Sequence, residues 1–78
     1  MDRRFGESRF WSTYIEDRKD GFSGLRLHRD NSGKTTVAAE CIFWDACGQF
    51  FFRTFDGDVP VDIALELIAE TRETIKVR

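Results

Sequence analysis

The sequence has little of several residue types that usually indicate a function. Its 78 residues include one histidine, one proline and two cysteines, and no run of about 18 apolar residues. The missing apolar run excludes a membrane-spanning helix. The cysteines form no Cys-x-x-Cys pair and have no histidines nearby, which excludes a zinc site. We expect Cys41 to be a buried apolar residue and Cys47 an exposed free thiol, and we predict no metal and no cofactor.

The sequence also lacks a large excess of charge of either sign. Twelve basic residues stand against fourteen acidic ones, for a net charge of −2. This balance argues against a general nucleic-acid or membrane-surface binder. The N-terminus has two arginines with no apolar stretch behind them and is no secretory signal, so a cytoplasmic location is expected.

The length allows one small domain over residues 1–78 and leaves no room for a doubly wound sheet or a barrel enzyme. Four segments rich in aromatic and β-branched residues alternate with turns that each end in glycine, which predicts strands joined by hairpins. The first eight residues are expected to be flexible. The predicted strands are residues 9–17, 22–30, 35–44 and 49–55.

The turns also predict how the strands pair. Three-residue loops at 19–21 and 31–33, and a two- or four-residue loop at the third turn, give registers that agree with one another. The expected partners are Ile15 with Leu25, Leu27 with Val37, Cys41 with Phe52 and Glu40 with Arg53. One face then forms the core: Trp11, Thr13, Ile15, Leu25, Leu27, Val37, Ala39, Cys41, Phe43, Phe50 and Phe52.

The last segment predicts an amphipathic helix over residues 60–74, capped at Asp58 or Val59, with Pro60 in its first turn. At about 100° per residue, its apolar residues gather on one broad side and its carboxylates on the other. The apolar side is Val61, Ala64, Leu65, Leu67, Ile68 and Thr71; the carboxylate side, expected to be solvated, is Asp62, Glu66, Glu70 and Glu73. Docking of a basic partner on these carboxylates is the alternative. The predicted fold class is α+β, a four-stranded antiparallel meander with one C-terminal helix packed on one face (ββββα, two layers).

The face of the sheet without the helix points to a function. An antiparallel sheet is normally polar where it meets water, yet this face has many aromatic residues, Phe10 and Tyr14 among them. We expect it to bind a second copy of the chain or another protein. The alternative that needs no partner is that the N-terminal segment, with Phe5, covers it. The candidate binding residues are Tyr14, Arg26, His28, Glu40, Ile42, Trp44, Phe51 and Arg53.

Single-stranded nucleic acid is the second candidate ligand for this face. Three aromatic residues are placed to stack bases and three basic ones to bind phosphates: Tyr14, Trp44 and Phe51, and Arg26, His28 and Arg53. In element order alone, ββββα resembles the Pur-type single-strand-binding repeats, and no residue is carried over from them.

No catalytic residue is predicted. Ser12 is expected opposite His28, with Glu16 or Glu40 on the same face, which invites comparison with a catalytic triad. A flat sheet face, however, offers neither an oxyanion hole nor a closed pocket that excludes water. We therefore expect a non-enzymatic protein.

Overall fold

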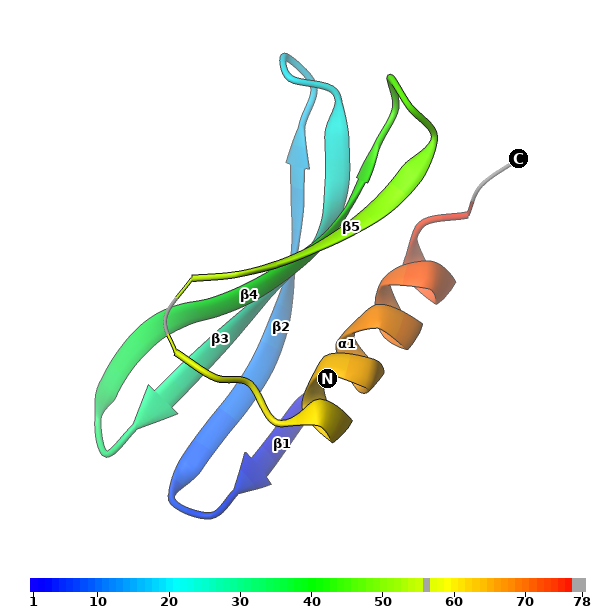
Figure 1. Cartoon of the computed structure of the whole chain (residues 1–78). Helices are drawn as coiled ribbons and strands as arrows, with labels where there is room; N and C mark the ends of the chain where they lie inside the picture. The colour runs from blue at the N-terminus through cyan, green and yellow to red at the C-terminus, as the bar shows by residue number, and fades with distance from the viewer. Residues whose placement is uncertain (56, 77–78) are drawn as a thin grey trace.

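One antiparallel sheet carries one helix on one of its faces in the computed structural model, which describes residues 1–55 and 57–76 (Figure 1). The strands follow one another in the order β1-β2-β3-β4-β5. The predicted α+β two-layer fold is confirmed, and each predicted element agrees to within one residue at either end. The predicted domain also included Asp56, Val77 and Arg78, which lie outside the described residues. The elements are β1 (Asp2–Phe5), β2 (Ser8–Asp17), β3 (Phe22–Asn31), β4 (Lys34–Trp44), β5 (Gln49–Thr54) and α1 (Val61–Thr74).

The additional strand, β1, comes from the segment that we expected to be flexible. Asp2 lies opposite Trp11 and Phe5 opposite Ser8, so the segment pairs antiparallel with β2. The carbonyl of Met1 also accepts a hydrogen bond from the Ser12 N–H at 3.1 Å. The sheet therefore has five strands, and β1 forms one of its edges.

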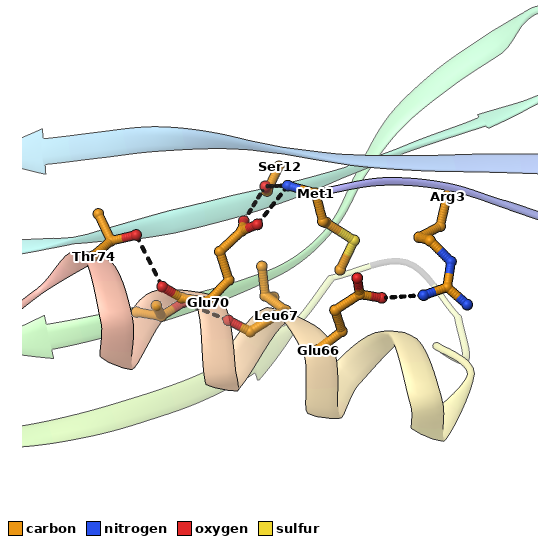
Figure 2. Close-up of polar contacts among 8 residues, drawn as sticks. Met1, Arg3, Ser12, Glu66, Leu67, Glu70 and Thr74 are labelled. Carbon is orange, nitrogen blue, oxygen red and sulfur yellow. Dashed lines mark hydrogen bonds and ion pairs between the residues drawn. The ribbon is translucent and has the colours of Figure 1, made fainter.

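The N-terminal ammonium and the Arg3 side chain of β1 bind the acidic flank of the helix (Figure 2). The Met1 ammonium donates to Glu70 Oε2 at 2.6 Å and to Ser12 Oγ at 2.7 Å, and Ser12 Oγ donates to Glu70 Oε1. Arg3 Nη1 donates to Glu66 Oε2 at 2.9 Å. The stripe of carboxylates expected to be solvated thus has a basic partner within the chain itself.

These contacts change the electrostatics of Glu70. Burial raises the pKa of its carboxyl, but the hydrogen bonds from the Met1 ammonium and Ser12 together lower it by more. The pKa of Glu70 therefore lies below the ordinary value of 4.5.

The contacts of Glu66 and Glu70 with the N-terminal segment go with a particular rotation of α1 about its own axis. Ile63, Leu67 and Thr71 are its buried residues, whereas Val61 and Leu65, predicted to lie in the core, are 71% and 59% exposed. The prediction was right for Leu67 and Thr71 and wrong for Val61 and Leu65, because the helix is rotated so that Glu66 and Glu70 lie towards β1. The resulting core consists of Phe10, Leu25, Leu27, Ala38, Ala39, Cys41, Ile63 and Leu67.

The start of the helix differs slightly from the prediction. Pro60 itself is the N-cap residue, and no side chain caps the helix, so neither Asp58 nor Val59 has the predicted role. Instead, the Asp58 carbonyl accepts a hydrogen bond from Arg29 Nη2.

The register of β2 against β3 differs by one residue from the prediction. The loop has four residues because Asp17 closes the turn: its carbonyl accepts the Gly21 N–H at 2.8 Å, and its carboxylate accepts the Asp20 N–H at 2.9 Å. Tyr14, rather than Ile15, lies opposite Leu25. A shift of one residue exchanges the two faces of a strand. Phe10, Ser12, Tyr14 and Glu16 therefore lie on the helix side, and Trp11, Thr13 and Ile15 lie on the other.

The β3–β4 turn also differs from the prediction. Its loop has two residues, Ser32 and Gly33, both with positive φ, instead of the predicted three at 31–33. A bulge at Ala38 then sets Leu27 opposite Ala39 rather than the predicted Val37. Because this is a shift of two residues, Ala39 and Cys41 keep their predicted face, whereas Val37 lies on the other face, opposite His28. Between β4 and β5 the predicted register is confirmed, with Cys41 opposite Phe52 and Glu40 opposite Arg53.

The sheet is strongly twisted (Figure 1), and two of its strands approach each other closely at Gly24. This glycine lies opposite Ile42, and a Cβ atom at position 24 would lie 2.1 Å from the carbonyl oxygen of Cys41. Any side chain there would force the backbones of β3 and β4 apart, so the close approach of these strands depends on glycine.

We expect Glu70→Gln to lower the free energy of unfolding by about 1–3 kcal/mol, because it replaces charge-assisted hydrogen bonds to the ammonium and to Ser12. Urea unfolding at pH 7 measures this change. Glu73→Gln, at an exposed position of the same helix, is the control and is expected to change stability by less than about 0.5 kcal/mol.

Acid is expected to remove the same contribution. Because the pKa of Glu70 is lower in the folded protein, its contribution is complete above the ordinary value of 4.5 and is lost as pH falls through the folded value. The difference between the wild type and Glu70→Gln should therefore shrink below about pH 4. A difference that stays constant from pH 7 to pH 3 would contradict this account.

Candidate functional site

The face of the sheet turned away from α1 is the candidate site, and we call it the open face. The core and α1 lie on the other side, and within residues 1–55 and 57–76 no helix or strand packs on the open face. Towards β1 the face continues with Asp2, Arg4 and Arg9. Its other residues come from β2 to β5 and the segment after β5. They are Trp11, Thr13, Ile15, Phe22, Gly24, Arg26, His28, Val37, Glu40, Ile42, Trp44, Gln49, Phe51, Arg53 and Phe55.

A buried carboxylate lies at the centre of the open face. Glu40 is only 3% exposed and lies between Arg26 of β3 and Arg53 of β5. Arg26 Nε donates to Oε2 at 2.6 Å, and Arg53 Nη2 and Nε donate to Oε1 at 2.7 and 2.9 Å. Because both oxygens are bound, this charge is buried without an unsatisfied acceptor. The cluster ties three strands together across the face.

Aromatic rings surround this cluster. The rings of Phe22 and Trp44 meet edge to face with centroids 5.0 Å apart, and the Arg53 guanidinium lies 5.9 Å from the Phe22 ring and 5.7 Å from the Phe55 ring. Ile42, on the same face, is fully buried. Phe51 lies opposite Ile42 but remains 49% exposed, and Phe55 is 54% exposed. The two phenylalanines thus keep about half of their surface in water.

A second aromatic group lies where β2 meets β3. Trp11 stacks on His28 with centroids 5.3 Å apart and ring planes 17° apart, and the Arg9 guanidinium lies 5.0 Å from the Trp11 ring. Thr13 Oγ1 is 2.8 Å from His28 Nε2. Burial lowers the pKa of His28, and the charge of Arg26 acts in the same direction. The imidazole is therefore mainly neutral at physiological pH.

Most of the predicted binding residues come together on this face. Arg26, His28, Glu40, Ile42, Trp44, Phe51 and Arg53 all belong to it. Tyr14 does not: it lies on the helix side, where its hydroxyl donates to Glu16 Oε2 at 2.9 Å. Sequence reasoning also missed Trp11 as an open-face residue. The signal for the correct register was the spacing of Asp17 and Gly21, which matches that of Trp44 and Gly48 in the third turn.

The arrangement contains none of the catalytic pairs considered from the sequence. Ser12 lies on the helix side and binds Glu70, so Thr13 takes the place beside His28. Among the described residues, no group of three or more His, Cys, Asp or Glu side chains is placed to hold a metal ion. That same part of the chain has no helix of the length and apolarity needed to cross a membrane. Both cysteines are free, with Cys41 buried and Cys47 exposed, as predicted.

We expect Glu40→Gln to lower the free energy of unfolding by about 1–3 kcal/mol, because two guanidinium groups would then face a neutral amide. Thermal or urea unfolding at pH 7 measures this loss, with Glu73→Gln again as the exposed control. Equal stability of Glu40→Gln and the wild type would show that the cluster does not stabilise the sheet.

Comparisons with family models, with curated proteins and with solved structures give no match for this chain. A function for the protein is therefore inferred from the geometry and chemistry of its own surface, above all from the open face.

Proposed function

We propose that this protein is a non-enzymatic association module, and that two copies form a homodimer by packing their open faces together. The observation that carries the proposal is the pair of half-exposed rings, Phe51 and Phe55, which continue an aromatic surface that nothing among the described residues covers. Apolar patches of this kind on small proteins usually mark an interaction site. A different protein bound to the same face is the outcome to pursue if the chain is monomeric.

The composition of the face suits a protein interface. Aromatic residues and Arg are enriched in the cores of protein interfaces and among the residues that contribute most to the binding free energy. Arg26 and Arg53 are already ordered by Glu40 and are still partly exposed, so they lose little conformational freedom when a partner covers them. A two-fold dimer needs only one self-complementary patch. The free cysteines fit a reducing cytoplasm, where we place the protein.

Single-stranded nucleic acid is supported less well. Arg26 and Arg53 share the negative charge of Glu40, which leaves the cluster with one net positive charge. His28 is mainly neutral, and Trp11 already has His28 and Arg9 against its ring, which limits its use for stacking a base. A labelled oligonucleotide titrated at low and high salt tests this alternative, since phosphate contacts would show as a steep loss of affinity with salt.

We expect Trp44→Glu to weaken the face-to-face association by about 30-fold or more while the domain stays folded, because position 44 lies on the open face, away from the core. Light scattering behind size exclusion, over a hundredfold range of concentration, measures the mass. Tyr14→Glu, at an exposed aromatic residue on the helix side, is the control. A folded Trp44→Glu protein with unchanged mass would overturn the proposal, and loss of its circular dichroism signal would show that the face is wrongly assigned.

A further inference from the structure

The sheet has a second unpaired surface, the outer edge of β5. This strand is last in the sheet, and no other strand of the described chain lies beyond it. The N–H of Phe55 donates to the Ala38 carbonyl of β4 at 3.0 Å. Alternate residues of an antiparallel strand direct their backbone groups to opposite sides. Phe50, Phe52 and Thr54 therefore direct their N–H and C=O groups outward, away from β4.

The two edges of the sheet differ in how they are protected. Natural edge strands avoid unwanted pairing by being short or by carrying charges. β1 has both properties, with four residues that include Asp2, Arg3 and Arg4. β5 is longer and has a single charged residue, Arg53, whose guanidinium is turned onto Glu40 of the open face. Phe51 projects on one side of this edge and Phe52, 40% exposed, on the other.

We propose that β5 pairs antiparallel with β5 of a second copy of this chain, so that two sheets join edge to edge. A two-fold axis perpendicular to the sheet keeps both helices on one side, so open-face residues of one copy lie beside open-face residues of the other. Phenylalanines then meet across the seam on both faces, which are favourable cross-strand pairs. Arg53 is the single charged residue of β5, and its ion pair with Glu40 offsets part of its charge at the seam.

This self-complementarity indicates that the strand bound at the β5 edge is a second copy of β5. An edge with a single charged side chain, itself ion-paired with Glu40, offers no charge pattern that would select a charged foreign strand, whereas a second β5 supplies matching aromatic residues and matching backbone groups. Because the β1 edge is charged and short, pairing stops at two copies. This inference goes beyond the proposed function: edge pairing and face packing use different surfaces, and together they give a tetramer of two-fold symmetry.

Charge substitution at Phe52 tests the pairing. We expect Phe52→Glu and Phe52→Lys each to weaken edge association by about tenfold or more, because like charges then lie close to the two-fold axis. An equimolar mixture of the two is expected to regain the wild-type mass, because unlike charges then meet. Leu65→Glu, at an exposed apolar residue on α1, is the matched control and is expected to keep the wild-type mass. Thr54→Pro, which removes one outward N–H without adding charge, is a second variant should either charged protein fail to fold.

The mass of each variant separates the two interfaces. If both exist, the wild type has the mass of four chains, Trp44→Glu and Phe52→Glu each have the mass of two, and the double variant has the mass of one. A dimer that Trp44→Glu dissociates and Phe52→Glu leaves intact would overturn edge pairing while the proposed function stands. A dimer with the reverse behaviour supports edge pairing and overturns face packing. A wild type that stays monomeric over the whole concentration range would overturn both.

Discussion

The ion pair between the Met1 ammonium and Glu70, supported by Arg3 and Glu66, determines how the rest of the structure is arranged. It holds β1 against both β2 and the helix, which closes one edge of the sheet. It also rotates α1 so that its acidic flank lies over β1. Ile63 and Leu67 then fill the core, and Val61 and Leu65 remain in water. A helix rotated to bury Val61 and Leu65 instead would separate Glu70 from the ammonium, which is itself almost fully buried and would lose its ion-pair partner.

Much of the fold was predictable because the strands and the helix depend on local signals. Periodicity and glycine-ended turns placed four of the five strands and the helix to within one residue at either end, and the register of β4 with β5 was predicted correctly. The β2–β3 register was wrong because a three-residue and a four-residue loop both fit the sequence there. The choice is made by Asp17, whose carbonyl and carboxylate both close the longer turn. One residue of shift was enough to place Tyr14 on the wrong face and to hide Trp11 from the prediction.

The rotation of the helix was beyond sequence reasoning for a different physical reason. Apolar periodicity alone favours burying Val61, Leu65 and Ile68 together. What opposes it is a set of contacts between residues more than 60 positions apart in the chain, such as Met1 with Glu70. Those contacts exist only if residues 2–5 form a strand, and a charged tetrapeptide without apolar alternation gives no such signal. An unpaired acidic stripe was therefore the one available hint that a basic segment of the chain lay nearby.

Glu40 connects the two surfaces proposed for association. On the open face it orders Arg26 and Arg53, so the polar centre of that face is fixed before any partner arrives. At the edge, the same carboxylate turns the only charged side chain of β5 towards the open face and offsets part of its charge. Without Glu40, Arg53 would place one uncompensated positive charge on each copy at the edge, and two such edges would repel each other. This carboxylate, buried at the centre of the open face, thus keeps the polar part of one surface ordered and lowers the positive charge at the other.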